Sequence, residues 1–285
     1  MVKTSLRLCF LFLVIVIMLC SCKDDKTSRT QASQYIIDSI YSKYLSEYRK
    51  HDIYLPQDFN EDLNYPIIYG TDGSSNVSDL KSILDSLIGN AIIKPVIFVA
   101  SHSNGKVADS TTAKRGDGTS LSLAYRYFEY TNQYYAQDSS YVHLKHRFAN
   151  HMDYFSEEFI PQFETKYKQE ATNNSRFFYG VSNGAGFGMS LLNTHPNRIG
   201  TYLCFSIFGG DIQTNTWNSN TSYPNLYIRY GSEEPFFLKD NAEFLQTKYQ
   251  ELNRFIDVKT FNGGHSDKFW KQEFINILSE VLKKE

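Results

Sequence analysis

Cysteine, runs of like charge and long apolar runs are all scarce in this sequence. Lys and Arg number 29 against 31 Asp and Glu, for a formal net charge of −2. No basic block occurs, so the sequence lacks the signature of a nucleic-acid-binding chain. Beyond residue 20 no apolar run approaches the roughly 18 residues of a membrane-spanning helix. Apolar residues make up 41% and aromatic residues 15%, which is enough for a large core and too much for a disordered protein.

The first residues have the pattern of a targeting segment. Lys3 and Arg7 precede an unbroken apolar run from Leu8 to Cys20. This run is shorter than the roughly 20 residues that span a bilayer, and it is typical of a signal peptide. It ends in Leu19-Cys20-Ser21-Cys22, which resembles a bacterial lipobox. The resemblance implies cleavage before Cys22 and a lipid on its thiol, although a secretory signal with incidental cysteines is the alternative.

Three segments follow from this interpretation: a signal peptide over 1–21, a lipidated Cys22 with a polar linker over 22–33, and one folded domain over 34–285. The lipid would anchor the protein to the bacterial cell envelope. The charged residues 23–26 (KDDK) resemble a tag for the outer face of the outer membrane. Of the four cysteines, only Cys204 would remain with a free thiol, so no intramolecular disulfide is expected.

From residue 34 onward, segments typical of strands alternate with segments typical of helices. This alternation predicts an α/β fold with a mostly parallel central sheet and helices on both faces. The expected strands are 35–44, 48–54, 66–69, 95–100, 177–181, 200–208, 226–230 and 256–261. The expected helices are 78–88 with Ser78 as N-cap, 144–169 with a kink or break at Pro161, 185–193, 239–254 and 268–283, while 101–143 is expected to be irregular.

The segment Gly180-Val181-Ser182-Asn183-Gly184 matches G-x-S-x-G. It lies between an expected strand and an expected helix, which is the context that this motif needs. A tight strand-to-helix turn would expose the hydroxyl of Ser182 above the sheet, and the glycines would leave room for the turn. Ser182 is therefore the candidate nucleophile.

A serine nucleophile needs a base and a carboxylate that orients the base. His265 follows Gly263-Gly264 directly after the last expected strand. Glu233 and Glu234 follow the strand 226–230, and either could be the acid. The chain order Ser182, glutamate, His265 is that of α/β-hydrolases. Two backbone N–H groups should bind the oxyanion, and our candidates are those of Asn183 and Ser74.

At this point the chain resembles an esterase family of α/β-hydrolases that includes enterochelin esterases, S-formylglutathione hydrolases, and feruloyl and acetylxylan esterases. The matching segments span the mature domain: DIYLPQDFN, YPIIYGTDG, PVIFVA, YRYFEY, FSEEFIPQFETKY, FFYGVSNGAGFGM, YIRYGSEEP and FNGGHSDKFW. The family pattern G-x-x-[D/E] selects Glu234 over Glu233. The chain departs from the family in having Glu where Asp is commoner and in its GTDG loop.

The resemblance implies a serine ester hydrolase that needs no metal or organic cofactor and acts on a small-molecule or polysaccharide-linked ester. Our first hypothesis for the substrate is an acetyl or feruloyl ester of a carbohydrate. The alternatives are a siderophore esterase, an acyltransferase on the same fold, and a non-catalytic binding module. The closely spaced His143, His146 and His151 suggest a metal site, but no Cys or cluster of carboxylates completes one. Arg126 and Glu129 in YRYFEY resemble the family's Arg-containing segment near the mouth of the active site. We prefer to interpret them as a local salt bridge that orders the loop 101–143.

Overall fold

The computed structural model describes residues 30–114, 120–132, 144–209 and 212–284, and the segment Ala32–Glu285 forms one compact unit. The predicted signal peptide, Cys22 and most of the linker lie outside the described residues. Within the described parts of the chain, no helix is both long and apolar enough to cross a membrane.

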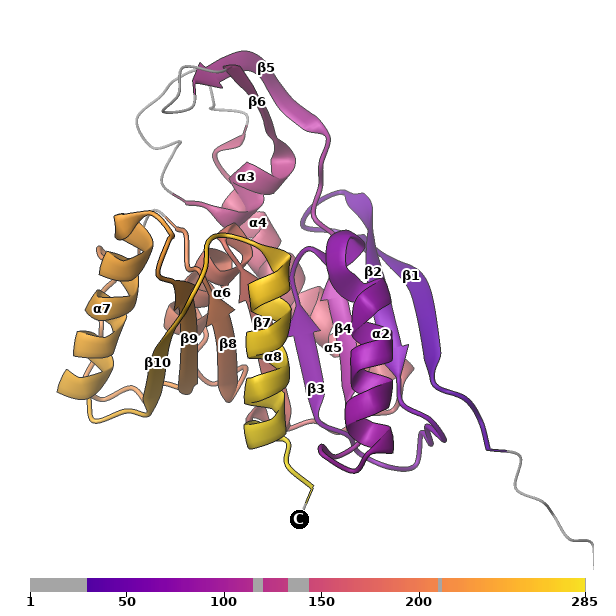
Figure 1. Ribbon diagram of the computed structural model, residues 1–285. Helices are drawn as coiled ribbons and strands as arrows, with labels where there is room; N and C mark the ends of the chain where they lie inside the picture. The colour runs from indigo at the N-terminus through magenta and orange to yellow at the C-terminus, as the bar shows by residue number, and fades with distance from the viewer. Residues whose placement is uncertain (1–29, 115–119, 133–143, 210–211, 285) are drawn as a thin grey trace, which may run out of the picture. The chain divides into compact units, whose positions relative to one another are not determined.

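An eight-stranded sheet forms the centre of this unit, in the order β1-β2-β4-β3-β7-β8-β9-β10 (Figure 1). β1 and β2 pair antiparallel, as do β2 and β4, and every other neighbouring pair in this sheet is parallel. The strands are β1 (Gln34–Ser42), β2 (Glu47–Leu55), β3 (Ile67–Gly70), β4 (Ile97–Ser101), β7 (Arg176–Val181), β8 (Thr201–Phe205), β9 (Asn225–Gly231) and β10 (Ile256–Phe261).

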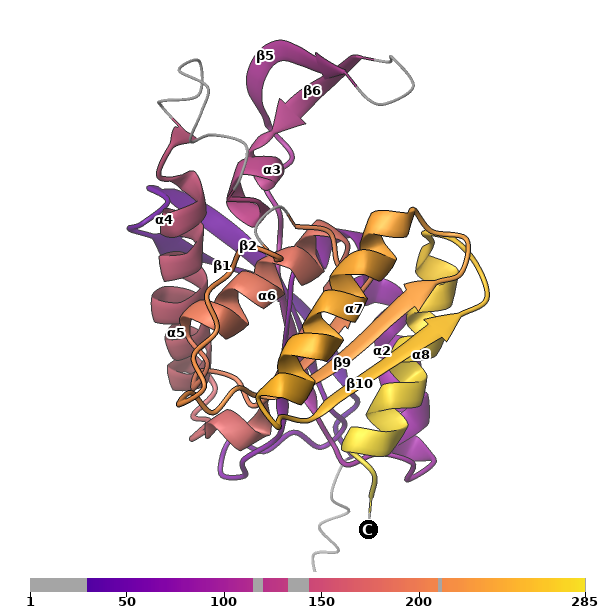
Figure 2. The ribbon, with the colours of Figure 1, turned by 90° about the vertical axis from the view of Figure 1, so that its left-hand side faces the viewer.

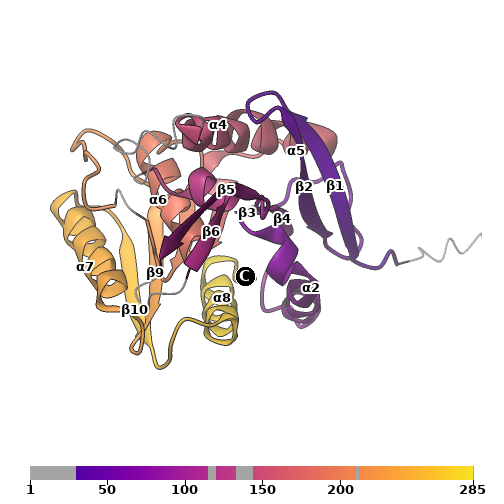
Figure 3. The same cartoon turned by 90° about the horizontal axis from the view of Figure 1, so that it is seen from above.

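Helices cover both faces of this sheet, as the view from above shows (Figure 3). One face packs against α2 (Gly73–Gly89) and α8 (Asp267–Val281), and the other against α4 (Arg147–Asp153), α5 (Ile160–Lys166), α6 (Asn183–Thr194) and α7 (Phe236–Glu251). The two faces bury separate apolar clusters, because β3, β4, β7 and β8 are apolar on both sides. The predicted fold class is therefore confirmed.

Two local predictions about helices differ from the structure. α2 begins at Gly73 rather than after Ser78, because Asp72 has the left-handed φ of 56° and turns the chain into the helix directly after β3. A Cβ at Gly73 would lie 2.4 Å from the Ala100 carbonyl oxygen, which explains the glycine there. Pro161 does not break its helix: a π-helical segment (Tyr154–Phe159) joins α4 to α5, and Pro161 lies in the first turn of α5.

The segment expected to be irregular forms a hairpin and a short helix. β5 (Val107–Lys114) pairs antiparallel with β6 (Ser120–Ala124), and α3 (Tyr125–Tyr130) follows directly. The hairpin extends beyond the carboxyl ends of the parallel strands (Figures 1 and 2). Its sequence is rich in Ser and Thr and lacks the apolar alternation that reveals a half-buried strand, so the prediction missed it.

Candidate active site

The predicted nucleophile, acid and base all follow strands of the parallel part of the sheet. Ser182 follows β7, Glu234 follows β9 and His265 follows β10. Because parallel strands end at a common edge, the three side chains meet although they are far apart in sequence. Such an edge is where open α/β sheets bind ligands.

Ser182 lies on a sharp turn with φ 53° and ψ −125°, a conformation that non-glycine residues rarely adopt. A Cβ at Gly180 would lie 2.7 Å from the backbone of Gly184, and one at Gly184 would lie 2.2 Å from Thr71 Oγ1. Both glycines of the motif are thus required by close packing. The turn places Ser182 directly before α6, as the motif predicts.

A continuous hydrogen-bond chain links the three side chains. His265 Nε2 is 3.1 Å from Ser182 Oγ, and His265 Nδ1 is 2.8 Å from Glu234 Oε1. With Nδ1 protonated toward the carboxylate, Nε2 can accept the serine proton. It is Glu234, and not Glu233, whose carboxylate reaches the imidazole.

The Glu234 carboxylate is 1% exposed and is fixed by two further donors. Ser206 Oγ donates to Oε1 at 2.6 Å, and the Gly231 N–H donates to Oε2 at 2.9 Å. Burial alone would raise the pKa of Glu234, but the hydrogen bonds from His265, Ser206 and Gly231 outweigh it and lower that pKa. Glu234 therefore stays ionised beside the imidazole.

Ser206 and Trp270 support the acid, and sequence reasoning missed this. Trp270 Nε1 donates to Ser206 Oγ at 2.8 Å, and the indole ring is perpendicular to the His265 ring at 4.6 Å. Trp270 is buried on α8, and it also touches the site. The position of Ser206 directly after the apolar strand β8 was the one available signal.

The two predicted oxyanion donors follow neighbouring strands, since β3 pairs with β7. Asn183 is the first residue of α6 and Ser74 is the second residue of α2, so both N–H groups are in first turns, where backbone donors lack helical partners. Their roles as oxyanion donors stay predictions.

Arg126 and Glu129 do not form the local salt bridge that the sequence suggested. Arg126 pairs with Asp72 and donates to Asn183, whereas Glu129 is fully buried between Arg49 and Arg147. Both charges on α3 thus bind distant elements. Burial alone would raise the pKa of Glu129, but its contacts with the two arginines lower it to about 2.

The remaining histidines do not form a metal site in the described part of the chain, where no cluster of three or more His, Cys, Asp or Glu side chains could hold a metal ion. His143 lies outside the described residues. His151 is buried among aromatic rings, and His102 Nε2 contacts Asp52 Oδ1 at 2.9 Å.

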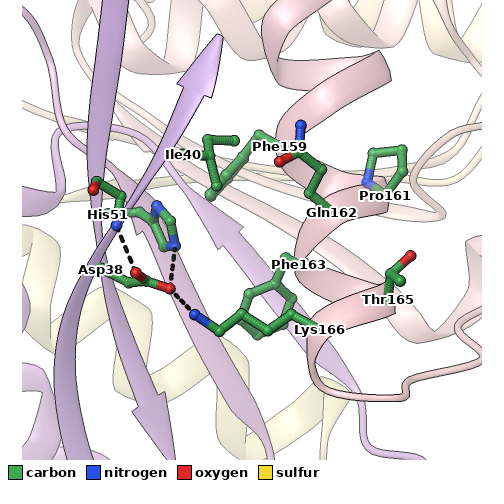
Figure 4. Close-up of a pocket in the computed structure, with 10 residues that line it drawn as sticks. Asp38, Ile40, His51, Phe159, Pro161, Gln162, Phe163, Thr165 and Lys166 are labelled. Carbon is green, nitrogen blue, oxygen red and sulfur yellow. Dashed lines mark hydrogen bonds and ion pairs between the residues drawn. The ribbon is translucent and has the colours of Figure 1, made fainter.

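A cavity of about 370 Å³ lies elsewhere, between β1, β2 and α5 (Figure 4). Phe159 and Phe163 form apolar walls, and Asp38 contacts both His51 and Lys166. None of the residues of the Ser182 site lines this cavity, so it is a separate feature of the molecule.

The sheet order, the strand-to-helix turn at Ser182 and the chain order of the site residues define an α/β-hydrolase fold. The family model described as "Putative esterase" matches residues 42–281. The chain belongs to this esterase family, a family of hydrolases. No curated protein matches the chain.

Solved structures with the same fold include three esterases or hydrolases. A ferulic acid esterase from Anaeromyces mucronatus, in complex with ferulic acid, has a TM-score of 0.65 at 16% identity, covering 90% of this chain and 95% of that one. An enterochelin esterase from Shigella flexneri has a TM-score of 0.62 at 16% identity, covering 89% and 60%. An IroE-like serine hydrolase from Shewanella oneidensis has a TM-score of 0.61 at 17% identity, covering 87% and 80%.

Proposed function

We propose that this chain is a serine esterase that hydrolyses carboxylic esters through an acyl-enzyme. The observation that carries the proposal is the unbroken hydrogen-bond chain from Ser182 through His265 to Glu234. Ser182 Oγ attacks the ester carbonyl while His265 Nε2 takes its proton. His265 then gives that proton to the leaving alcohol, and Glu234 stabilises the imidazolium. Water, activated by the same imidazole, releases the acid.

The tetrahedral intermediate carries a negative charge that needs donors. The N–H of Asn183 and that of Ser74 are our candidates, because each lies in the first turn of a helix beside the nucleophile. The positive end of the α6 dipole adds to this stabilisation.

Aromatic residues in the segments that follow Ser206 and Glu234 support an aromatic acyl group in the substrate. Phe208 donates its backbone N–H to the Ser182 carbonyl oxygen at 3.2 Å, so the segment that carries this ring lies beside the nucleophile turn. Its ring centroid is 5.5 Å from that of Phe237, which is 5.9 Å from that of Phe236. Phe236 is 76% exposed and Phe237 38% exposed, although both are apolar. Within the carbohydrate esters expected from the sequence, these rings favour a feruloyl over an acetyl group.

The test is hydrolysis of methyl ferulate and p-nitrophenyl acetate by the wild type and by Ser182→Ala. We expect the variant to lose about 10⁴-fold or more in kcat for both esters, and we expect wild type to prefer methyl ferulate. Ser190→Ala, which removes a hydroxyl from the same helix, is the matched control and should keep its activity. Equal background rates for wild type and Ser182→Ala would contradict the proposal, and a preference for the acetate would contradict the feruloyl assignment.

We also propose that the enzyme is held at the bacterial cell envelope by a lipid on Cys22, at the outer membrane. The support is the lipobox-like segment, which lies outside the described residues. Replacing Cys22 by Ser should move the protein from the membrane fraction to the soluble fraction of lysed cells. A Cys22→Ser protein that still sediments with membranes would contradict the anchor.

A further inference from the structure

Arg126 forms hydrogen bonds with both segments that carry the candidate oxyanion donors. Its Nε and Nη2 donate to the two carboxylate oxygens of Asp72 at 2.7 and 2.8 Å, which is a bidentate ion pair. Its Nη1 donates to Asn183 Oδ1 at 3.2 Å. Asp72 precedes the first turn of α2, and Asn183 begins α6. One guanidinium thus joins the loop after β3 to the turn after β7.

The Asp72 segment is held in place by several contacts at once. The Asp72 N–H donates to the Tyr130 hydroxyl at 3.3 Å, and the Arg126 guanidinium stacks on the Tyr130 ring at 4.9 Å. A Cβ at Gly184 would lie 3.2 Å from Asp72 Oδ2, so the loop packs directly against the first turn of α6. The left-handed φ of Asp72 is costly for an aspartate and needs such contacts to persist.

The helix α3, which carries Arg126, is itself held by ion pairs. Glu129, one turn further along this helix, binds Arg49 of β2 at 2.7 Å and Arg147 of α4 at 2.6 Å. These ion pairs fix α3 relative to the sheet, and α3 fixes Arg126. The guanidinium is not free to bind a substrate anion, because Asp72 neutralises its charge.

We propose that Arg126 is a positioning residue for the oxyanion hole, a role that rests on the proposed esterase function. It sets the distance between the first turn of α2 and the first turn of α6, and so the spacing of the two N–H donors. A spacing that fits the tetrahedral intermediate lowers the barrier without strengthening the binding of the planar ester. The loss of Arg126 therefore acts on kcat and leaves KM nearly unchanged.

The test compares wild type, Arg126→Gln and Arg126→Lys with methyl ferulate, and measures the inhibition constant of a boronic acid that forms a tetrahedral adduct with Ser182. We expect kcat of Arg126→Gln to fall about 10²- to 10³-fold, as for the loss of an oxyanion donor, with KM within about twofold. Boronate affinity should fall in parallel. A lysine ammonium cannot bind both Asp72 oxygens and Asn183 in fork geometry, so Arg126→Lys should recover only part of the loss. Arg198→Gln, which removes a surface arginine paired with Glu157, is the matched control and should behave like wild type.

A rise in KM at unchanged kcat would overturn the proposal and assign Arg126 to substrate binding. An unchanged kcat and boronate affinity in both variants would overturn it too. If Arg126→Gln does not fold, which thermal unfolding would show, Arg126→Lys decides by the same criteria. Failure of the esterase function is distinguishable, because wild type itself would then neither hydrolyse esters in a Ser182-dependent way nor bind the boronate.

Discussion

The acid–base side of the site (Ser206, Glu234, His265 and Trp270) and its oxyanion side (Asp72, Arg126 and Asn183) are held by different kinds of contact. On the acid–base side, the supporting donors are a hydroxyl, an indole N–H and a backbone N–H, all neutral. On the oxyanion side, the support is a bidentate ion pair, with a second buried ion-pair cluster behind it.

The elements that supply these contacts differ in the same way. The acid–base side is made by segments directly after β8, β9 and β10 and by the first turn of α8, so the sheet itself fixes its geometry. The oxyanion side depends on α3, which follows the β5–β6 hairpin and belongs to no strand of the central sheet. On that side, ion pairs between residues far apart in sequence fix the geometry instead of the sheet. The two sides should therefore respond differently to mutation and to pH.

The largest effect that separates the two sides is expected for Glu234→Gln. The amide cannot hold His265 in the tautomer that accepts the serine proton, so kcat should fall about 10⁴-fold while the fold persists. Steady-state kinetics with methyl ferulate measures this loss. Glu233→Gln is the matched control, because it removes the adjacent charge without touching the imidazole. A comparable loss in Glu233→Gln would contradict the assignment of the acid.

The contrast between the two sides also explains which parts of the site could be predicted. Ser182, Glu234 and His265 each follow a strand in a short local pattern, and parallel strands bring such positions to one edge. The contacts that support them are not local. Ser206 and Glu234 are 28 residues apart in sequence, Trp270 and Ser206 are 64 apart, and Arg126 and Asp72 are 54 apart. No periodicity or motif encodes these pairs.

The elements of the fold also divide into those with a local sequence pattern, which were predicted, and those without one, which were missed. The strands of the central sheet were predicted within a few residues, and the inner ones stand out because burial on both faces leaves continuous apolar segments. The hairpin β5–β6 was missed because its sequence is rich in Ser and Thr and lacks an apolar alternation. The early start of α2 was missed because it depends on the left-handed turn at Asp72, which its contacts with Arg126 and Tyr130 support.

A smaller effect should appear in stability, and it concerns the core behind the oxyanion side. His151 packs at 5.3 Å from the Tyr130 ring of α3 and 4.8 Å from the Phe187 ring of α6. Burial lowers the pKa of His151 from 6.5 to about 3, although the nearby Glu129 opposes this shift. The folded protein thus keeps a neutral imidazole down to about pH 3, while the unfolded chain takes up a proton below about pH 6.5.

The free energy of unfolding should therefore be constant with respect to this group above about pH 6.5 and fall as the pH decreases from there. One such group contributes about 1.4 kcal/mol per pH unit, or about 2 kcal/mol between pH 7.5 and 5. Glu129, with its pKa lowered to about 2, contributes only below about pH 4.5, so this window excludes it. The side chain in His151→Gln is neutral at every pH, so this variant should lose about 2 kcal/mol of the pH dependence that urea unfolding measures. His146→Gln changes an exposed histidine of the same segment and is the control for loss of an imidazole. If wild type and His151→Gln lost the same free energy of unfolding between pH 7.5 and 5, the core behind the oxyanion side would not be acid-sensitive. The two sides would then differ in their contacts but not in their response to pH.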